Sequence, residues 1–69
     1  MTLTPTAFEQ LDTEDAEAVL RMRLRALVRI GFDPVNAMVL ATHVDVDVER
    51  AADLLRRGCP QDTAVRILA

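Results

Sequence analysis

The sequence contains no lysine, tryptophan or tyrosine, and it has two phenylalanines, two glycines and one cysteine among 69 residues. A single cysteine excludes an internal disulfide, so no covalent crosslink holds the fold. Two isolated glycines exclude a glycine-rich phosphate-binding loop. Because aromatic side chains are so few, a core must be built from aliphatic residues.

Long hydrophobic runs are also lacking. The longest stretch without a charged residue is 34–44, well below the ~20 apolar residues that a membrane span needs. The first residues include no basic cluster, which predicts that no secretory signal is present. We therefore expect a cytoplasmic protein without a membrane partner.

The net charge of −3 argues against nucleic-acid binding, because affinity for DNA or RNA comes mainly from basic side chains that meet phosphates. All eight basic residues are arginines. Either GC-rich coding or selection for guanidinium contacts explains this bias. We favour the coding bias, which indicates a bacterial or phage source.

Size and composition predict one small globular domain. Hydrophobic residues make up 51% of the chain and charged residues 28%, a normal balance for a folded domain. A chain of this length buries only ~60% of the surface that its unfolded form exposes, so its stability is expected to be marginal.

The first long helix is predicted from Asp12–Thr13 to about Ile30, with acidic residues at its start and arginines in its later turns, as the helix dipole favours. Glu17 and Arg21 have the spacing of an ion pair. Helical spacing predicts one buried stripe, which comprises Ala16, Val19, Leu20, Leu24, Leu27 and Val28. On another face, Arg21, Arg25 and Arg29 form a row that is either a contact for phosphate or an acidic partner or, as we favour, a solvated surface.

The segment from Ile30 to Pro34 connects this helix to the next. Gly31 can end a helix because it tolerates positive φ angles. Asp33 can cap the following helix, and Pro34 suits its first position. Phe32 lies between the stop and the start, where it either fills the core or is displayed as a contact.

Helix signals continue to the end of the chain. The second helix is predicted from Pro34 to about Thr42. The alternation over 44–49 resembles a strand, but a single short strand has no partner here, so a loop is favoured. Asp47 then caps a third helix that Gly58 ends.

Short helices are also predicted at both ends, over Pro5–Leu11 and from Pro60 onward. The prediction is an all-α, compact three-helix bundle with these short extra helices. It divides the chain into an N-terminal arm or short helix (1–12), the bundle (13–58) and a short C-terminal helix or tail (59–69).

The order of these signals resembles the ubiquitin-associated (UBA) domain family. The residues that carry the resemblance are Leu27-x-x-Ile30-Gly31-Phe32, then Ala37 and Leu40, the acidic cap Asp47, and Val48-Glu49-Arg50-Ala51-Ala52-Asp53-Leu54-Leu55. They cover about residues 14–58. The resemblance implies a three-helix UBA-like bundle that binds a protein partner without catalysis.

The resemblance also implies where the partner binds. In ubiquitin-binding members, the Gly-Phe loop and the end of the third helix form one apolar patch with charged residues at its rim. The matching residues here are Ile30, Gly31, Phe32, Leu54, Leu55, Arg56 and Arg57. The implied partner is ubiquitin or, given the composition, another bacterial or phage protein.

Residues for catalysis or cofactor binding are scarce. One histidine and one cysteine cannot form a structural zinc site, which needs four ligands. Asp45, Asp47 and Glu49 lack the central glycine and ligand spacing of a calcium loop. We expect no enzyme activity, cofactor or metal, and we expect His43 to cap the second helix at the surface.

Two other functions fit the sequence less well. The chain could be a structural or regulatory subunit of a larger bacterial or phage assembly, held by its apolar ends (Phe8, Leu11, Val65, Ile67 and Leu68). It could also be a helix-turn-helix DNA binder in which Arg50, Arg56 and Arg57 reach phosphates. Glu49 and Asp53 on the same helix would repel the DNA backbone.

Overall fold

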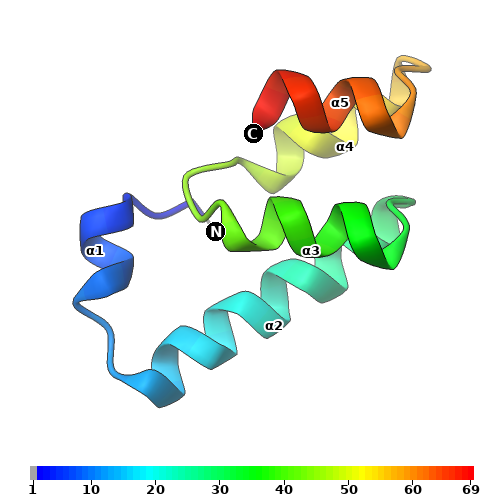
Figure 1. Ribbon diagram of the computed structural model, residues 1–69. Coiled ribbons are helices and arrows are strands. Elements are labelled where there is room, and N and C mark those ends of the chain that lie inside the picture. The colour runs from blue at the N-terminus through cyan, green and yellow to red at the C-terminus, as the bar shows by residue number, and fades with distance from the viewer. Residues whose placement is uncertain (1) are drawn as a thin grey trace.

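The computed structural model describes residues 2–69, and this part of the chain contains five helices and no strand (Figure 1). The helices are α1 (Pro5–Glu9), α2 (Thr13–Ile30), α3 (Pro34–Thr42), α4 (Val48–Arg56) and α5 (Gln61–Leu68). The predicted all-α class is confirmed. None of these helices is long and apolar enough to cross a membrane.

Helices α2 to α5 pack together, with α3 lying between α2 and the α4–α5 pair (Figure 1). Helix α2 contacts α3 and α4, and α5 contacts α3 and α4. The short helix α1 stands to one side of this body (Figure 1). The backbone N–H of Leu3 ties the N-terminal arm to the carbonyl of Val44 at 2.9 Å.

Side-chain caps set the starts of the first four helices. The carboxylates of Asp12, Asp33 and Asp47 accept hydrogen bonds from backbone N–H groups in the first turns of α2, α3 and α4, at 2.8 to 2.9 Å. The Thr4 hydroxyl does the same for α1 at 3.1 Å. Such caps satisfy donors that have no partner inside the helix. Pro60 was predicted to be the first residue of the last helix but precedes α5 as its N-cap.

The two glycines end α2 and α4 with the same motif. At Gly31, with φ of 121°, the N–H donates to Val28 O and the N–H of Phe32 donates to Leu27 O. At Gly58, with φ of 86°, the N–H donates to Leu55 O and the next N–H donates to Leu54 O. These paired bonds form the Schellman motif, which turns the residue after the glycine back against the helix.

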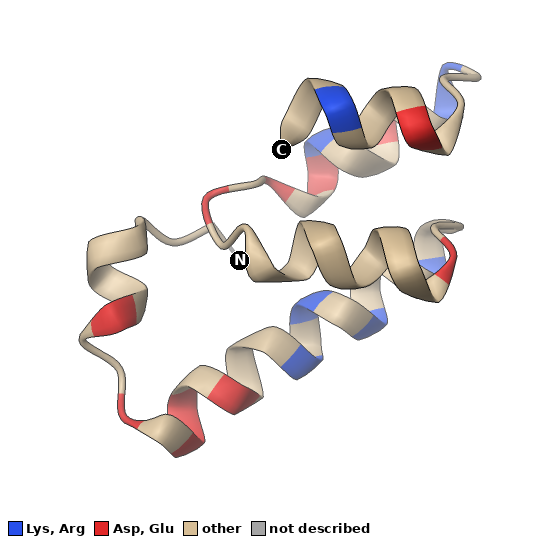
Figure 2. Ribbon diagram, in the orientation of Figure 1, with Lys and Arg blue, Asp and Glu red and all other residues tan. Residues whose placement is uncertain are grey.

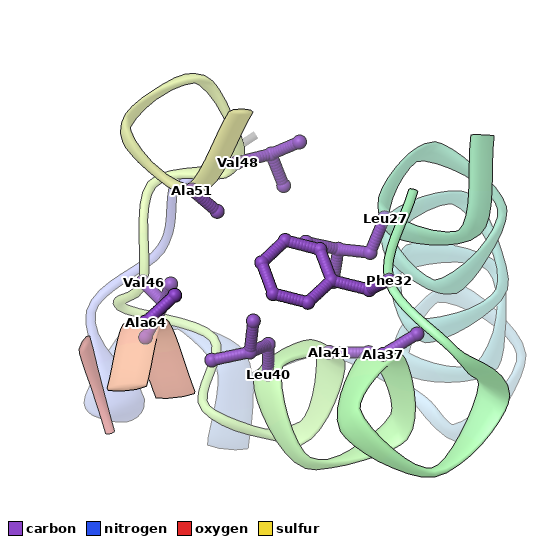
Figure 3. Packing of buried hydrophobic residues seen from close by; sticks show 9 residues of the cluster. All are labelled: Leu27, Phe32, Ala37, Leu40, Ala41, Val46, Val48, Ala51 and Ala64. Atoms are coloured by element: carbon purple, nitrogen blue, oxygen red, sulfur yellow. The ribbon is translucent and has the colours of Figure 1, made fainter. Parts of the chain in front are cut away.

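This turn places Phe32 in the core. Its side chain is only 2% exposed, and Figure 3 shows its ring between α2, α3 and α4, near Leu27. The other buried members of this cluster are Leu27, Ala37, Leu40, Ala41, Val46, Val48, Ala51 and Ala64. Of the two alternatives for Phe32, the structure therefore shows the one in which it fills the core.

The alternating valines lie in the loop between α3 and α4 and, for Val48, at the first position of α4. Val44, Val46 and Val48 are buried, whereas Asp45 and Asp47 are exposed. The segment is a turn and not a strand, as predicted. Burial alternates here without a sheet, and Val46 and Val48 belong to the buried cluster.

Two predictions about α2 are wrong. Of the predicted buried stripe, only Leu27 is fully buried; Ala16, Val19, Leu20 and Leu24 are half-buried and Val28 is 45% exposed, whereas Arg23 is 1% exposed. Glu17 and Arg21 form no ion pair within residues 2–69. The buried side of α2 therefore includes Arg23, which the spacing of the apolar residues alone does not indicate.

Candidate interaction surface

The loop after α2 and the end of α4 come together in the structure. A Cβ atom placed on Gly31 would lie 3.6 Å from the Cδ1 atom of Leu55. The two segments are distant in sequence, and both end in a Schellman motif. The structure thus brings together the two segments that the resemblance implies for partner binding.

The apolar members of this surface are half-buried. Ile30, Leu54 and Leu55 pack against the core cluster and keep part of their side chains accessible. Gly31 between them is exposed, so the backbone is open to close approach. Phe32 does not belong to this surface because its ring points into the core (Figure 3).

The two arginines at the rim are exposed and share one carboxylate. Arg57 Nε lies 3.0 Å from Asp53 Oδ2, and Arg56 Nη2 lies 3.4 Å from Asp53 Oδ1. Such exposed pairs contribute little to stability. They hold both guanidinium groups near Asp53, on the same helix as Leu54 and Leu55 or just beyond its end. We define the patch surface as Ile30, Gly31, Leu54, Leu55, Arg56 and Arg57.

Sequence reasoning missed the most unusual side chain, Arg23. Its Nη2 donates to the carbonyls of Val46 at 2.7 Å, His43 at 3.0 Å and Leu40 at 3.2 Å. Its Nε donates to Ala41 O at 3.2 Å. These acceptors are the last carbonyls of α3 and the loop that follows.

Arg23 therefore caps the C-terminal end of α3, where no glycine ends the helix. The last carbonyls of a helix have no partner inside it and carry the negative end of the helix dipole, so a cation there is favourable. Another carbonyl of the last turn, Val39 O, accepts from the Thr42 hydroxyl at 2.9 Å and contacts His43 Nδ1 at 2.7 Å. The predicted surface cap at His43 is confirmed.

The electrostatic setting of Arg23 follows from its depth. Burial lowers its pKa below the ordinary value, and the nearby carboxylates of Asp45 and Asp47 oppose this shift. A signal for this role existed in the sequence. Arg23 follows Ala16 and Leu20 and precedes Leu27 at three- and four-residue steps, so it lies on the buried face of α2.

One apolar pocket lies beside Arg23. It has a volume of about 240 Å³ and is lined by Thr2, Leu3, Val19, Met22 and Arg23. Typical small-molecule sites hold roughly 300–1,000 Å³, so this pocket suits a single side chain better than a cofactor. Within residues 2–69, no three His, Cys, Asp or Glu side chains are placed to hold a metal ion.

The residues behind the other two hypotheses are distributed as follows. Val65 and Leu68 pack against the core, Phe8 and Leu11 are half-buried, and Ile67 is exposed. Arg50 is exposed on α4. The side chains of the apolar ends are thus divided between the interior and the surface.

Comparison with known proteins adds no relative. No family model, no curated protein and no solved structure matches this chain.

Proposed function

We propose that this protein is a small non-catalytic interaction module of UBA-like type, which binds a protein partner through the patch surface. The observation that carries this proposal is the proximity of the two segments: a Cβ atom placed on Gly31 would lie 3.6 Å from Leu55 Cδ1. It joins the loop to the end of α4, as the resemblance implies for a partner site.

The chemistry of the patch surface supports a weak and reversible contact. Its apolar part is small, since Ile30, Leu54 and Leu55 are half-buried. Its rim is basic, because Arg56 and Arg57 are exposed. A small apolar surface with a charged rim is typical of transient protein contacts.

The test is an amide-resolved NMR titration of the labelled protein with ubiquitin as the probe. We expect saturable shifts at Ile30, Gly31 and residues 54–57. The double variant Arg56→Glu/Arg57→Glu should weaken binding about tenfold, which corresponds to ~1.4 kcal/mol.

A matched control carries the same charge change elsewhere. Arg50→Glu/Arg66→Glu alters two exposed arginines outside the patch surface and should leave the affinity within about twofold. Shifts confined to other helices would refute the patch surface. If ~1 mM ubiquitin causes no shift, ubiquitin is not the partner.

A further inference from the structure

The outer face of α3 is apolar and open. Val35 is 74% exposed and Met38 is 51% exposed, and they lie three residues apart on one side of the helix. Figure 2 shows that α3 carries no charged residue, whereas the other long helices do. Two exposed apolar side chains on one side of a helix without charged residues form an apolar patch, and such patches often mark interaction sites.

The neighbouring helix α2 separates its charges by sign. Its cap and first turns carry Asp12, Glu14, Asp15 and Glu17, and its second half carries the exposed arginines Arg21, Arg25 and Arg29 (Figure 2). Those three arginines form no ion pair within residues 2–69. The second half of α2, the helix that packs on α3, therefore presents positive charge that no carboxylate within residues 2–69 pairs.

The acidic half of α2 projects beyond α3. At 1.5 Å per residue, the 18 residues of α2 span ~27 Å and the nine of α3 only ~14 Å. A three-residue loop joins the two helices at one end, so the unmatched length of α2 lies at its acidic start (Figure 1). The molecule is accordingly elongated, at 37 × 18 × 16 Å.

We propose that a second copy of this chain covers the α2–α3 face, with the two α2 helices antiparallel. Glu14, Glu17, Arg21, Arg25 and Val28 follow one another at steps of three or four residues, so they share one side of α2. An antiparallel second copy places Glu14 and Glu17 of each chain opposite Arg25 and Arg21 of the other. The projecting acidic half of each copy then lies beside Val35 and Met38 of its partner.

The chain itself supplies the occupant that this face requires. The exposed arginines of α2 call for an acidic partner, and the projecting half of α2 carries Asp12, Glu14, Asp15 and Glu17. A twofold interface is self-complementary, so one patch with opposite charges at its two ends satisfies it. The dimer is independent of the patch surface and would display two copies of it.

Charge reversal in matched variants tests the dimer by sedimentation equilibrium. The wild type should dimerise, and added salt should weaken the dimer. Variant A, Arg21→Glu/Arg25→Glu, and variant B, Glu14→Arg/Glu17→Arg, should each weaken self-association about tenfold or more, because attraction becomes repulsion in both halves of the interface. An equimolar mixture of A and B should restore a one-to-one dimer, since every opposed pair is again of opposite sign.

Controls separate the proposed contact from general effects of charge. Arg50→Glu/Arg66→Glu has the same charge change as variant A and should dimerise like the wild type. If a reversed variant fails to fold by circular dichroism, Met38→Ser provides the second test, because this exposed side chain contributes little to the monomer but should weaken the dimer. A wild type that is monomeric at ~1 mM would overturn the proposal. So would a dimer that tolerates variants A and B and Met38→Ser.

Discussion

The guanidinium of Arg23 joins two segments of the fold at once. It is 1% exposed and donates to carbonyls at the end of α3 and in the loop that leads to α4. A lysine could not reproduce this planar set of donors. The arginine side chain thus satisfies backbone carbonyls that lie 17 to 23 residues further along the sequence.

We expect Arg23→Met to lower the free energy of unfolding by about 3 kcal/mol. The methionine fills similar space, but the carbonyls of Leu40, Ala41 and Val46 lose the charged donor that satisfies them inside the protein. Urea unfolding followed by circular dichroism measures this loss. The neighbouring exposed variant Arg25→Met should change stability by less than ~0.5 kcal/mol; equal losses in the two variants would contradict the buried role.

Phe32 can be tested with a substitution that keeps the domain folded. Phe32→Leu should cost ~1–2 kcal/mol in unfolding free energy, because the smaller side chain leaves space beside Leu27. Partner affinity per folded molecule should stay unchanged, since the ring is 2% exposed. A stable variant with lost partner binding would instead indicate that the ring is displayed.

The placement of these two residues shows how far sequence reasoning reaches. Burial of Phe32 follows from a local rule, since the residue after a Schellman glycine packs back on its own helix. That rule was available in the sequence. The hydrogen-bond partners of Arg23 could not be predicted from the sequence, because they depend on where α3 ends relative to α2. In addition, an arginine among other arginines resembles part of a solvated helix face.

Helix ends are the most predictable elements of this protein. Asp12, Asp33 and Asp47 cap α2, α3 and α4 where the sequence placed the caps, and Gly31 and Gly58 end α2 and α4. These signals act over three or four residues, so no knowledge of the tertiary fold is needed. Contacts between helices, such as the one that places Gly31 beside Leu55, cannot be predicted from these local signals because they depend on how the helices pack.

The two glycines should not be equally replaceable. Both have positive φ, but the 121° of Gly31 lies farther than the 86° of Gly58 from the left-handed region near +57° that other residues tolerate. We expect Gly58→Ala to cost ~1 kcal/mol and Gly31→Ala ~2 kcal/mol. Thermal unfolding of both variants measures the difference.

The reason for this difference is strain in the backbone and not a lack of space. A Cβ on Gly31 would make an ordinary contact with Leu55, and a Cβ on Gly58 would meet nothing within 4 Å. The reverse order of stabilities would show that helix packing around the glycines, rather than φ, controls the cost.

Across the whole molecule, stability should be unevenly distributed. The buried cluster joins α2, α3, α4 and α5, whereas α1 contains no buried residue and stands to one side of them (Figure 1). Regions with few buried contacts open without global unfolding. The N-terminal arm and the bundle are therefore expected to open independently.

Hydrogen exchange measures this difference directly. The free energy of opening measured at the amides of Phe8 and Glu9 in α1 should be below ~1 kcal/mol, because opening this short helix exposes little apolar surface. The amides of Leu27, Leu40 and Ala51 should exchange only with global unfolding, since their residues are fully buried in the core. If the amides of α1 are as protected as that of Leu40, the arm belongs to the cooperative unit. If a second copy in a dimer supplies this protection, it should disappear when the protein is diluted to the monomer.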